Sequence, residues 1–118
     1  MKLDNQIAND SKAFAIRIIK LYKYLLEKQE YILSKQMLRS GTSIGANVSE
    51  SVFAQSRLDF ISKMSIALKE ANETKYWLDL LFETNYIDNK LYDSIVYDLK
   101  IIIGTLVNII KTSKQNNL

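Results

Sequence analysis

The chain has 118 residues, a formal net charge of +3, and neither cysteine nor histidine. The missing cysteines exclude disulfides, thiolate metal sites and cysteine nucleophiles, and the missing histidines exclude the commonest general base and transition-metal ligand. With only three glycines and no proline, the composition favours long helices over tight turns and sheets.

Apolar residues recur at alternating three- and four-residue steps in four segments, a pattern that predicts four amphipathic helices. The first helix is expected over about residues 6–29, where an apolar seam runs from Ile7 to Leu25. The second is expected over about residues 34–53. Ser34 is its candidate N-cap, because a serine hydroxyl accepts a hydrogen bond from a first-turn amide.

The second segment contains two glycines, Gly41 and Gly45, inside a helical pattern. Each glycine costs about 1 kcal/mol of helix stability relative to alanine, so some contact should offset the loss. Both fall on the apolar face of the helix. We therefore predict that a neighbouring helix approaches closely at these positions.

The third helix is expected over about residues 57–84 and the fourth over about residues 89–112. Ser56, followed three residues later by Asp59, is a capping signal for the third helix. Asp88 is the candidate N-cap of the fourth helix.

Short connections between long helices make neighbouring helices antiparallel. We therefore predict an all-α fold, an antiparallel up-down four-helix bundle that forms one domain over residues 1–118. No segment reaches 18 uninterrupted apolar residues, and the first residues lack the apolar core of a signal peptide. We expect a cytoplasmic protein with no membrane partner.

Four polar residues, Arg39, Ser43, Asn47 and Glu50, fall within a sector of about 80° on the second helix. One interpretation is a solvated polar face, supported by neighbours spaced three or four residues apart. The other is a hydrogen-bonded seam against another helix or another subunit. The sequence leaves both open.

The third helix has a second unusual face, on which Ile66 and Trp77 flank Glu70 and Glu73. Large apolar residues beside carboxylates are typical of a subunit interface with an aromatic anchor and ionic partners. The alternative is a wide core helix with two incidental surface acids.

Catalytic chemistry finds little support in the sequence. No histidine can activate a serine or threonine, and no glycine-rich loop is present to cradle a phosphate. Glu50, Glu70 and Glu73 could offer oxygen ligands to magnesium, but metal sites in helix bundles usually add a Glu-x-x-His pair. We predict no enzyme activity, no metal or other cofactor, and no small-molecule substrate.

Charge is unevenly distributed along the chain. Residues 11–26 contain basic residues and no acid, whereas residues 79–98 contain five acids and one lysine. The basic residues of the first stretch are Lys12, Arg17, Lys20 and Lys23. Besides simple solvation, two interpretations compete: this face binds nucleic-acid phosphates, or it meets an acidic surface of another subunit in a head-to-tail ring.

The run from Gln36 to Glu50, together with Asp59-Phe60 and the run from Ile66 to Ala71, resembles a family signature. The family is that of the bacterial 23S rRNA intervening sequence proteins, four-helix bundle proteins that are also labelled S23 ribosomal proteins. The likeness covers nearly the whole chain, and the stretch that begins at Arg39 is fairly specific.

The resemblance implies a protein that assembles as a homopentameric ring. Some family members are encoded within sequences that interrupt ribosomal RNA genes, and a related branch is the accessory protein of diversity-generating retroelements, which associates with a reverse transcriptase and nucleic acid. It therefore implies a noncatalytic oligomer associated with RNA or DNA. The residues that we expect to contact phosphates are Lys12, Arg17, Lys20, Lys23 and Arg39. The alternative is a structural or protein-interaction scaffold, in which the same charges join subunits or dock a partner protein.

Overall fold

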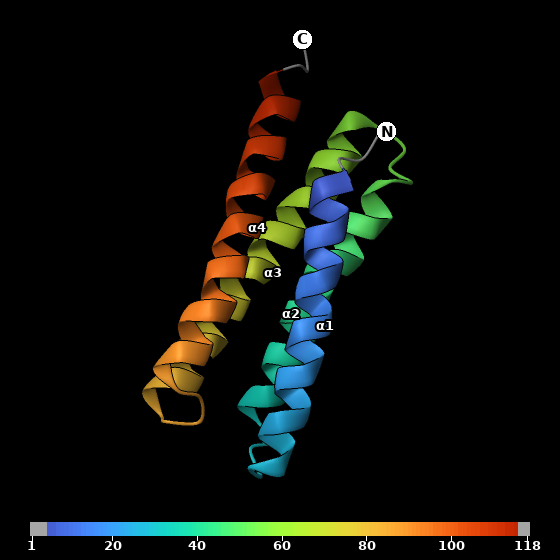
Figure 1. The fold of residues 1–118 in the computed structure, drawn as a ribbon. Coiled ribbons are helices and arrows are strands. Elements are labelled where there is room, and N and C mark those ends of the chain that lie inside the picture. The colour runs from blue at the N-terminus through green and yellow to red at the C-terminus, as the bar shows by residue number, and fades with distance from the viewer. Residues whose placement is uncertain (1–4, 116–118) are drawn as a thin grey trace.

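The computed structural model describes residues 5–115, which form four helices. They are α1 (Asn5–Glu27), α2 (Leu33–Ser51), α3 (Arg57–Glu83) and α4 (Asn89–Gln115). Figure 1 shows that α1 descends from the end of the bundle marked N, α2 returns, α3 descends again and α4 ascends, so consecutive helices are antiparallel. The predicted all-α, up-down four-helix bundle is confirmed, and each helix end lies within three residues of its predicted position. Within the described part of the chain, no helix is long and apolar enough to span a membrane.

The helices contact one another in chain order around the bundle. The interface between α2 and α3 is the most extensive, and α1 and α4 close the bundle with the sparsest contact of the four neighbouring pairs. The molecule is therefore long and thin, about 50 Å by 20 Å, and the α1–α4 side is its most open flank.

The four apolar seams face inward and form one core. Its largest fully buried side chains are Ile7, Phe14, Ile18, Leu25, Met37, Ile44, Met64, Leu78, Leu81, Ile95, Leu99 and Ile102. Burial of one such side chain stabilises the fold by roughly 1.5–3 kcal/mol, so the core dominates the stability of the bundle.

The N-terminus of α2 is capped by a carboxylate, and the prediction that Ser34 is the N-cap is wrong. Glu30 Oε2 accepts hydrogen bonds from the amides of Ile32 and Leu33 at 3.2 and 3.1 Å, and Oε1 accepts one from the amide of Ser34. Ser34 lies inside the first turn, where its hydroxyl donates to the Glu30 carbonyl at 2.7 Å. Because α2 begins one residue before Ser34, at Leu33, the Ser34 amide is itself one of the first-turn amides that need an acceptor, and the Glu30 carboxylate accepts from it and from two others.

The predicted caps of α3 and α4 are confirmed. Ser56 Oγ accepts from the amide of Asp59 at 3.0 Å, and the Asp59 carboxylate accepts from the amide of Gln55 at 3.1 Å, so the two side chains satisfy one amide on each side of the N-cap. Asp88 Oδ1 accepts from the amide of Leu91 at 2.8 Å.

Close approach of α1 and α2 at the two glycines is also confirmed. A Cβ atom added to Gly41 would lie 2.9 Å from Ile18 Cγ2, and one added to Gly45 would lie 3.3 Å from the Ser11 carbonyl oxygen. Real Cβ atoms do not approach other atoms as closely as the first of these distances. The absent side chains therefore set the spacing of these two helices.

Candidate nucleic-acid interface

The outward face of α1 carries Lys12, Lys20 and Lys23, all exposed. None of the three forms an ion pair with a carboxylate of residues 5–115. Ile16 and Ile19 lie partly exposed among them. This face can therefore offer three ammonium groups to an anion without first giving up an internal partner.

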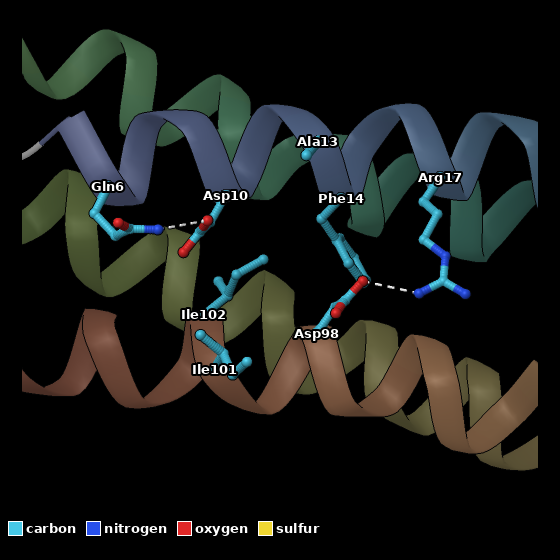
Figure 2. A pocket seen from close by; sticks show the side chains of 8 residues that line it. All are labelled: Gln6, Asp10, Ala13, Phe14, Arg17, Asp98, Ile101 and Ile102. Carbon is cyan, nitrogen blue, oxygen red and sulfur yellow. Dashed lines mark hydrogen bonds and ion pairs between the residues drawn. The ribbon is translucent and has the colours of Figure 1, made fainter.

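Arg17, the fourth basic residue of α1, turns toward α4 instead. Its guanidinium pairs with Asp98 at 2.8 Å and donates to the hydroxyl and the carbonyl oxygen of Ser94 at 2.7 and 3.2 Å. Figure 2 shows this arm reaching across the α1–α4 flank beside Phe14. Arg17 thus joins the two helices that otherwise contact each other least.

A cleft of about 360 Å³ lies next to this ion pair, between α1 and α4. Its apolar floor includes Phe14 and Ile102, and its rim includes Asp10, whose carboxylate accepts a hydrogen bond from Gln6 at 2.8 Å (Figure 2). The cleft contains carboxylates and a single cation that already has a carboxylate partner, so it does not favour a phosphate group.

Arg39 joins the polar row of α2 to the acidic face of α3, which are separate in the sequence. From α2, its guanidinium pairs with Glu70 at 3.2 Å and with Glu73, both on α3. Trp77 Nε1 donates to the same Glu73 oxygen at 3.0 Å. The hydrogen bond from Trp77, aided by Arg39, lowers the pKa of Glu73 despite the opposing effect of desolvation. The polar row of α2 and the acidic strip of α3 therefore meet within one chain.

The rest of the polar row follows the same boundary between α2 and α3. Ser43 donates to the Arg39 carbonyl oxygen at 2.6 Å, and Asn47 donates to the Ser43 carbonyl oxygen at 2.9 Å. Glu50 pairs with Lys63 of α3 at 3.5 Å. The two charged ends of the row, Arg39 and Glu50, thus fit the interpretation of a seam, because each pairs with a residue of α3. The two residues between them, Ser43 and Asn47, bond to backbone carbonyls within α2.

Two further polar contacts were not predicted from the sequence. Inside the α2–α3 interface, the Thr74 hydroxyl donates to Ser40 Oγ at 2.8 Å, with both residues fully buried. The signal was present, since both residues fall at inward positions where small polar side chains need a partner.

The second missed contact joins α3 to α4. Lys75 pairs with Asp79 at 2.8 Å, and the Tyr92 hydroxyl donates to the same carboxylate. Burial opposes ionisation of Asp79, but the hydrogen bonds from Lys75 and Tyr92 outweigh it and lower the pKa of Asp79. Tyr92 also stacks on Phe82, with ring centroids 4.5 Å apart.

These contacts leave the surface charge unbalanced. Acidic side chains that pair with a base or cap a helix are Glu30, Glu50, Asp59, Glu70, Glu73, Asp79, Asp88 and Asp98. No group of three or more acids that could hold a metal occurs within residues 5–115. Within residues 5–115, the three α1 lysines are exposed and form no ion pair, whereas most carboxylates pair with a base or cap a helix.

The small residues that let α1 and α2 approach each other also form an outer groove of about 560 Å³. Its lining includes Ala8, Ala15, Gly45 and Ala46, with Lys12 at the same surface. The groove thus adjoins one of the exposed lysines of α1, Lys12, and widens the surface that an extended anionic partner could cover there.

The fold and the charge pattern together define a class, an all-α bundle whose buried polar groups and ion pairs join its helices and whose α1 face is basic. The chain belongs to the family described as 23S rRNA-intervening sequence proteins, whose model matches residues 3–108. The resemblance found in the sequence is therefore confirmed.

A solved structure supports the same assignment. The chain is similar to a protein of unknown function from the S23 ribosomal protein family of Bacteroides thetaiotaomicron VPI-5482, with 56% sequence identity and a TM-score of 0.88. The match covers 89% of this chain and 98% of that one. None of the curated proteins matches the chain.

Proposed function

We propose that this protein is a noncatalytic, cytoplasmic homo-oligomer that associates with RNA or DNA through the outward face of α1. The observation that carries the proposal is the set of three exposed lysines, Lys12, Lys20 and Lys23, which form no ion pair within the described chain. The family's name refers to sequences within a ribosomal RNA, which favours RNA as the first ligand to test.

The spacing of the lysines suits a nucleic-acid backbone. At 1.5 Å per residue, Lys12 and Lys23 are about 16 Å apart along α1, a length that spans about five phosphates of one strand of a duplex. Three lysines on one chain give weak binding by themselves. Several copies in one assembly, five by the family resemblance, would present several such faces to one strand and raise the overall affinity.

Arg17 and Arg39, the other two basic residues expected at phosphates, have competing partners. Each would have to exchange a carboxylate for a phosphate, and each exchange would open a contact between helices. We expect their substitution to affect stability more than nucleic-acid affinity.

A salt titration of binding to a single-stranded RNA oligonucleotide tests the proposal. Replacing Lys12, Lys20 and Lys23 with glutamine should reduce the slope of log K against log salt concentration by about two, since each lost phosphate contact removes about 0.7. The matched control replaces Lys35, Lys90 and Lys114, three exposed lysines of α2 and α4, and should leave the slope nearly unchanged. Equal slopes for both triple variants would reject the α1 face as the binding surface.

A structural scaffold is the second candidate, and a specific observation favours it. Two of the five expected phosphate contacts, Arg17 and Arg39, bind carboxylates of the same chain. A scaffold would bind no nucleic acid, and its assembly would depend on the α3 strip, so Trp77→Ala or Glu70→Lys should reduce the assembled mass in light scattering. Normal mass in both variants, together with salt-dependent RNA binding, would decide against the scaffold.

A further inference from the structure

Gly104 differs from the other two glycines of the chain. Gly41 and Gly45 lie against α1, whereas a Cβ atom added to Gly104 meets no other atom within 4 Å. Gly104 sits exposed within α4, where glycine lowers the ratio of folded to unfolded chain about fivefold relative to alanine. Nothing in the described part of the chain offsets that loss, so the position fits a close approach from outside.

The residues around Gly104 form a second apolar stripe on α4, turned away from the core. Tyr97 is 66% exposed, and Ile101 and Val107 are each 44% exposed. Tyr97, Ile101 and Gly104 follow the i, i+4, i+7 spacing of one helix face. A glycine at the centre of such a stripe leaves a hollow into which a bulky side chain of another helix can fit.

Lysines accompany this stripe. Lys100 and Lys111 are exposed, and neither forms an ion pair with a carboxylate of residues 5–115. The single acid between Tyr97 and Lys111 is Asp98, which Arg17 holds. A partner helix should therefore combine bulky apolar side chains with carboxylates.

The helix faces of a second copy can be compared with that requirement. The outward face of α1 presents lysines, and a second α4 would place its own Lys100 and Lys111 opposite the first pair, so like charges oppose both arrangements. The outward face of α2 presents small side chains, among them Ala46 and Ser49.

The strip on α3 meets the requirement. Ile66 and Tyr76 are exposed, Tyr76 and Trp77 stack edge to face with centroids 5.2 Å apart, and Glu73 lies beside them. Glu70 and Glu73 are balanced by Arg39 and Lys69, so this surface is mixed in charge, unlike the lysine-only surfaces above. Its carboxylates can share their positive partners with an approaching lysine.

We propose that the Gly104 face of α4 in one copy packs against the Ile66–Trp77 face of α3 in the next copy. This inference rests on the proposed homo-oligomer and names the two surfaces that build it. Because the two surfaces differ, the contact is heterologous, and its repetition generates a ring or a filament. The outward face of α1 takes no part in the contact and stays available to nucleic acid.

Two variants that each block one surface provide the test. Gly104→Leu fills the hollow on α4, and Ile66→Lys places a charge on the α3 strip opposite Lys100 and Lys111. Each variant alone should be monomeric in sedimentation velocity at concentrations where the native protein is assembled. An equimolar mixture should form a 1:1 dimer, since the α4 face of one variant and the α3 face of the other remain intact.

Gly104→Ala keeps the experiment informative if Gly104→Leu fails to fold. It should raise the melting temperature of the monomer and weaken assembly at least tenfold, a combination that a role confined to the single chain would not produce. Assembly of Ile66→Lys alone at full mass, or a mixture that stays monomeric, would overturn the inference.

The remaining outcomes separate this inference from the proposed function. If the Gly104→Leu variant alone assembles as well as the native protein, the interface is overturned and the proposed function still stands. Native protein that is monomeric overturns the interface and the homo-oligomer together. Loss of RNA binding in the α1 triple variant with assembly unchanged supports the proposed function independently of this contact.

Discussion

α1 packs against its two neighbours in different ways. Toward α2, the helices come so close that a methyl group at Gly41 would collide with Ile18. Toward α4, contacts are sparse, a cleft of about 360 Å³ remains open, and the Arg17 side chain reaches across to Asp98. The comparison teaches that a close helix contact depends on residues without a side chain, whereas a wide contact depends on long side chains that bridge it.

Filling the close contact should have the largest effect. Gly41→Val adds a branched side chain 2.9 Å from Ile18 Cγ2, in a place where Ile18 is fully buried and cannot move aside. We expect a loss of about 3 kcal/mol in the free energy of unfolding, the upper range for overpacking a core. Urea denaturation followed by circular dichroism measures it.

The control for this substitution is Ala46→Val, which places the same side chain on the exposed face of α2. It should cost about 0.5 kcal/mol through helix propensity. The double variant Gly41→Val with Ile18→Ala should recover part of the loss, because the added volume then has space. Equal costs for Gly41→Val and Ala46→Val would show that the α1–α2 contact is not close in solution.

The turn that joins these two close helices depends on Glu30. Removing its carboxylate in Glu30→Ala leaves the amides of Ile32, Leu33 and Ser34 without this acceptor. Since N-cap substitutions cost about 0.5–2 kcal/mol, and the Glu30 side chain is buried, we expect a loss near 2 kcal/mol.

Glu30 should also make stability depend on pH. Burial opposes its ionisation, but hydrogen bonds from the amides of Ser34, Leu33 and Ile32 outweigh burial and lower its pKa. A carboxyl with a lowered pKa in the folded state stabilises the fold above its unfolded pKa of about 4.3, and that contribution is lost as pH falls through the lower, folded value. Glu30→Gln should flatten the unfolding free energy of the protein in this acidic range, whereas Glu27→Gln, an exposed neighbour, should not.

The bridge on the open flank should contribute less. Arg17→Ala removes a partly exposed ion pair with Asp98 and two hydrogen bonds to Ser94, and we expect a loss of about 1 kcal/mol. A double-mutant cycle with Asp98→Ala should give a coupling energy below about 1 kcal/mol that declines at high salt. Coupling that persists in 1 M salt would mean that the pair is more deeply buried than the structure shows.

The same contrast explains what could be predicted from the sequence. Helix number and direction follow from the four apolar seams, and the caps at Ser56 and Asp88 follow because each side chain bonds an amide three residues away. The glycines of α2 were informative for a similar reason, since their cost is visible locally. Each of these signals lies within one helix.

The bridges between helices were not predictable in this way. Arg17 and Asp98 are 81 residues apart, and each looks like an ordinary surface charge on its own helix. Arg39 and the acids of α3 both stand on unusual helix faces, but nothing in their spacing shows that they meet each other rather than a second subunit. The Ser34 cap was predicted wrongly because the helix begins one residue earlier, at Leu33, and its first amides bond to a carboxylate that precedes the helix, that of Glu30.

The open flank should tolerate an added side chain that the close flank rejects. Ala13 is exposed on α1 and lines the α1–α4 cleft beside Phe14 and Ile101, so Ala13→Leu can cover apolar surface there without a collision. Covering about 20 Å² of apolar surface stabilises the fold by about 0.5 kcal/mol, at the coefficient of 25 cal/mol per Å². We expect the unfolding free energy of Ala13→Leu to rise by this amount. Gly45→Leu, on the opposite flank of α1, should be strongly destabilising, and the two results together would confirm that one flank is open and the other close. A loss above 1 kcal/mol for Ala13→Leu would mean that α4 lies closer to α1 in solution, and that Arg17 holds a closed contact rather than spanning an open one.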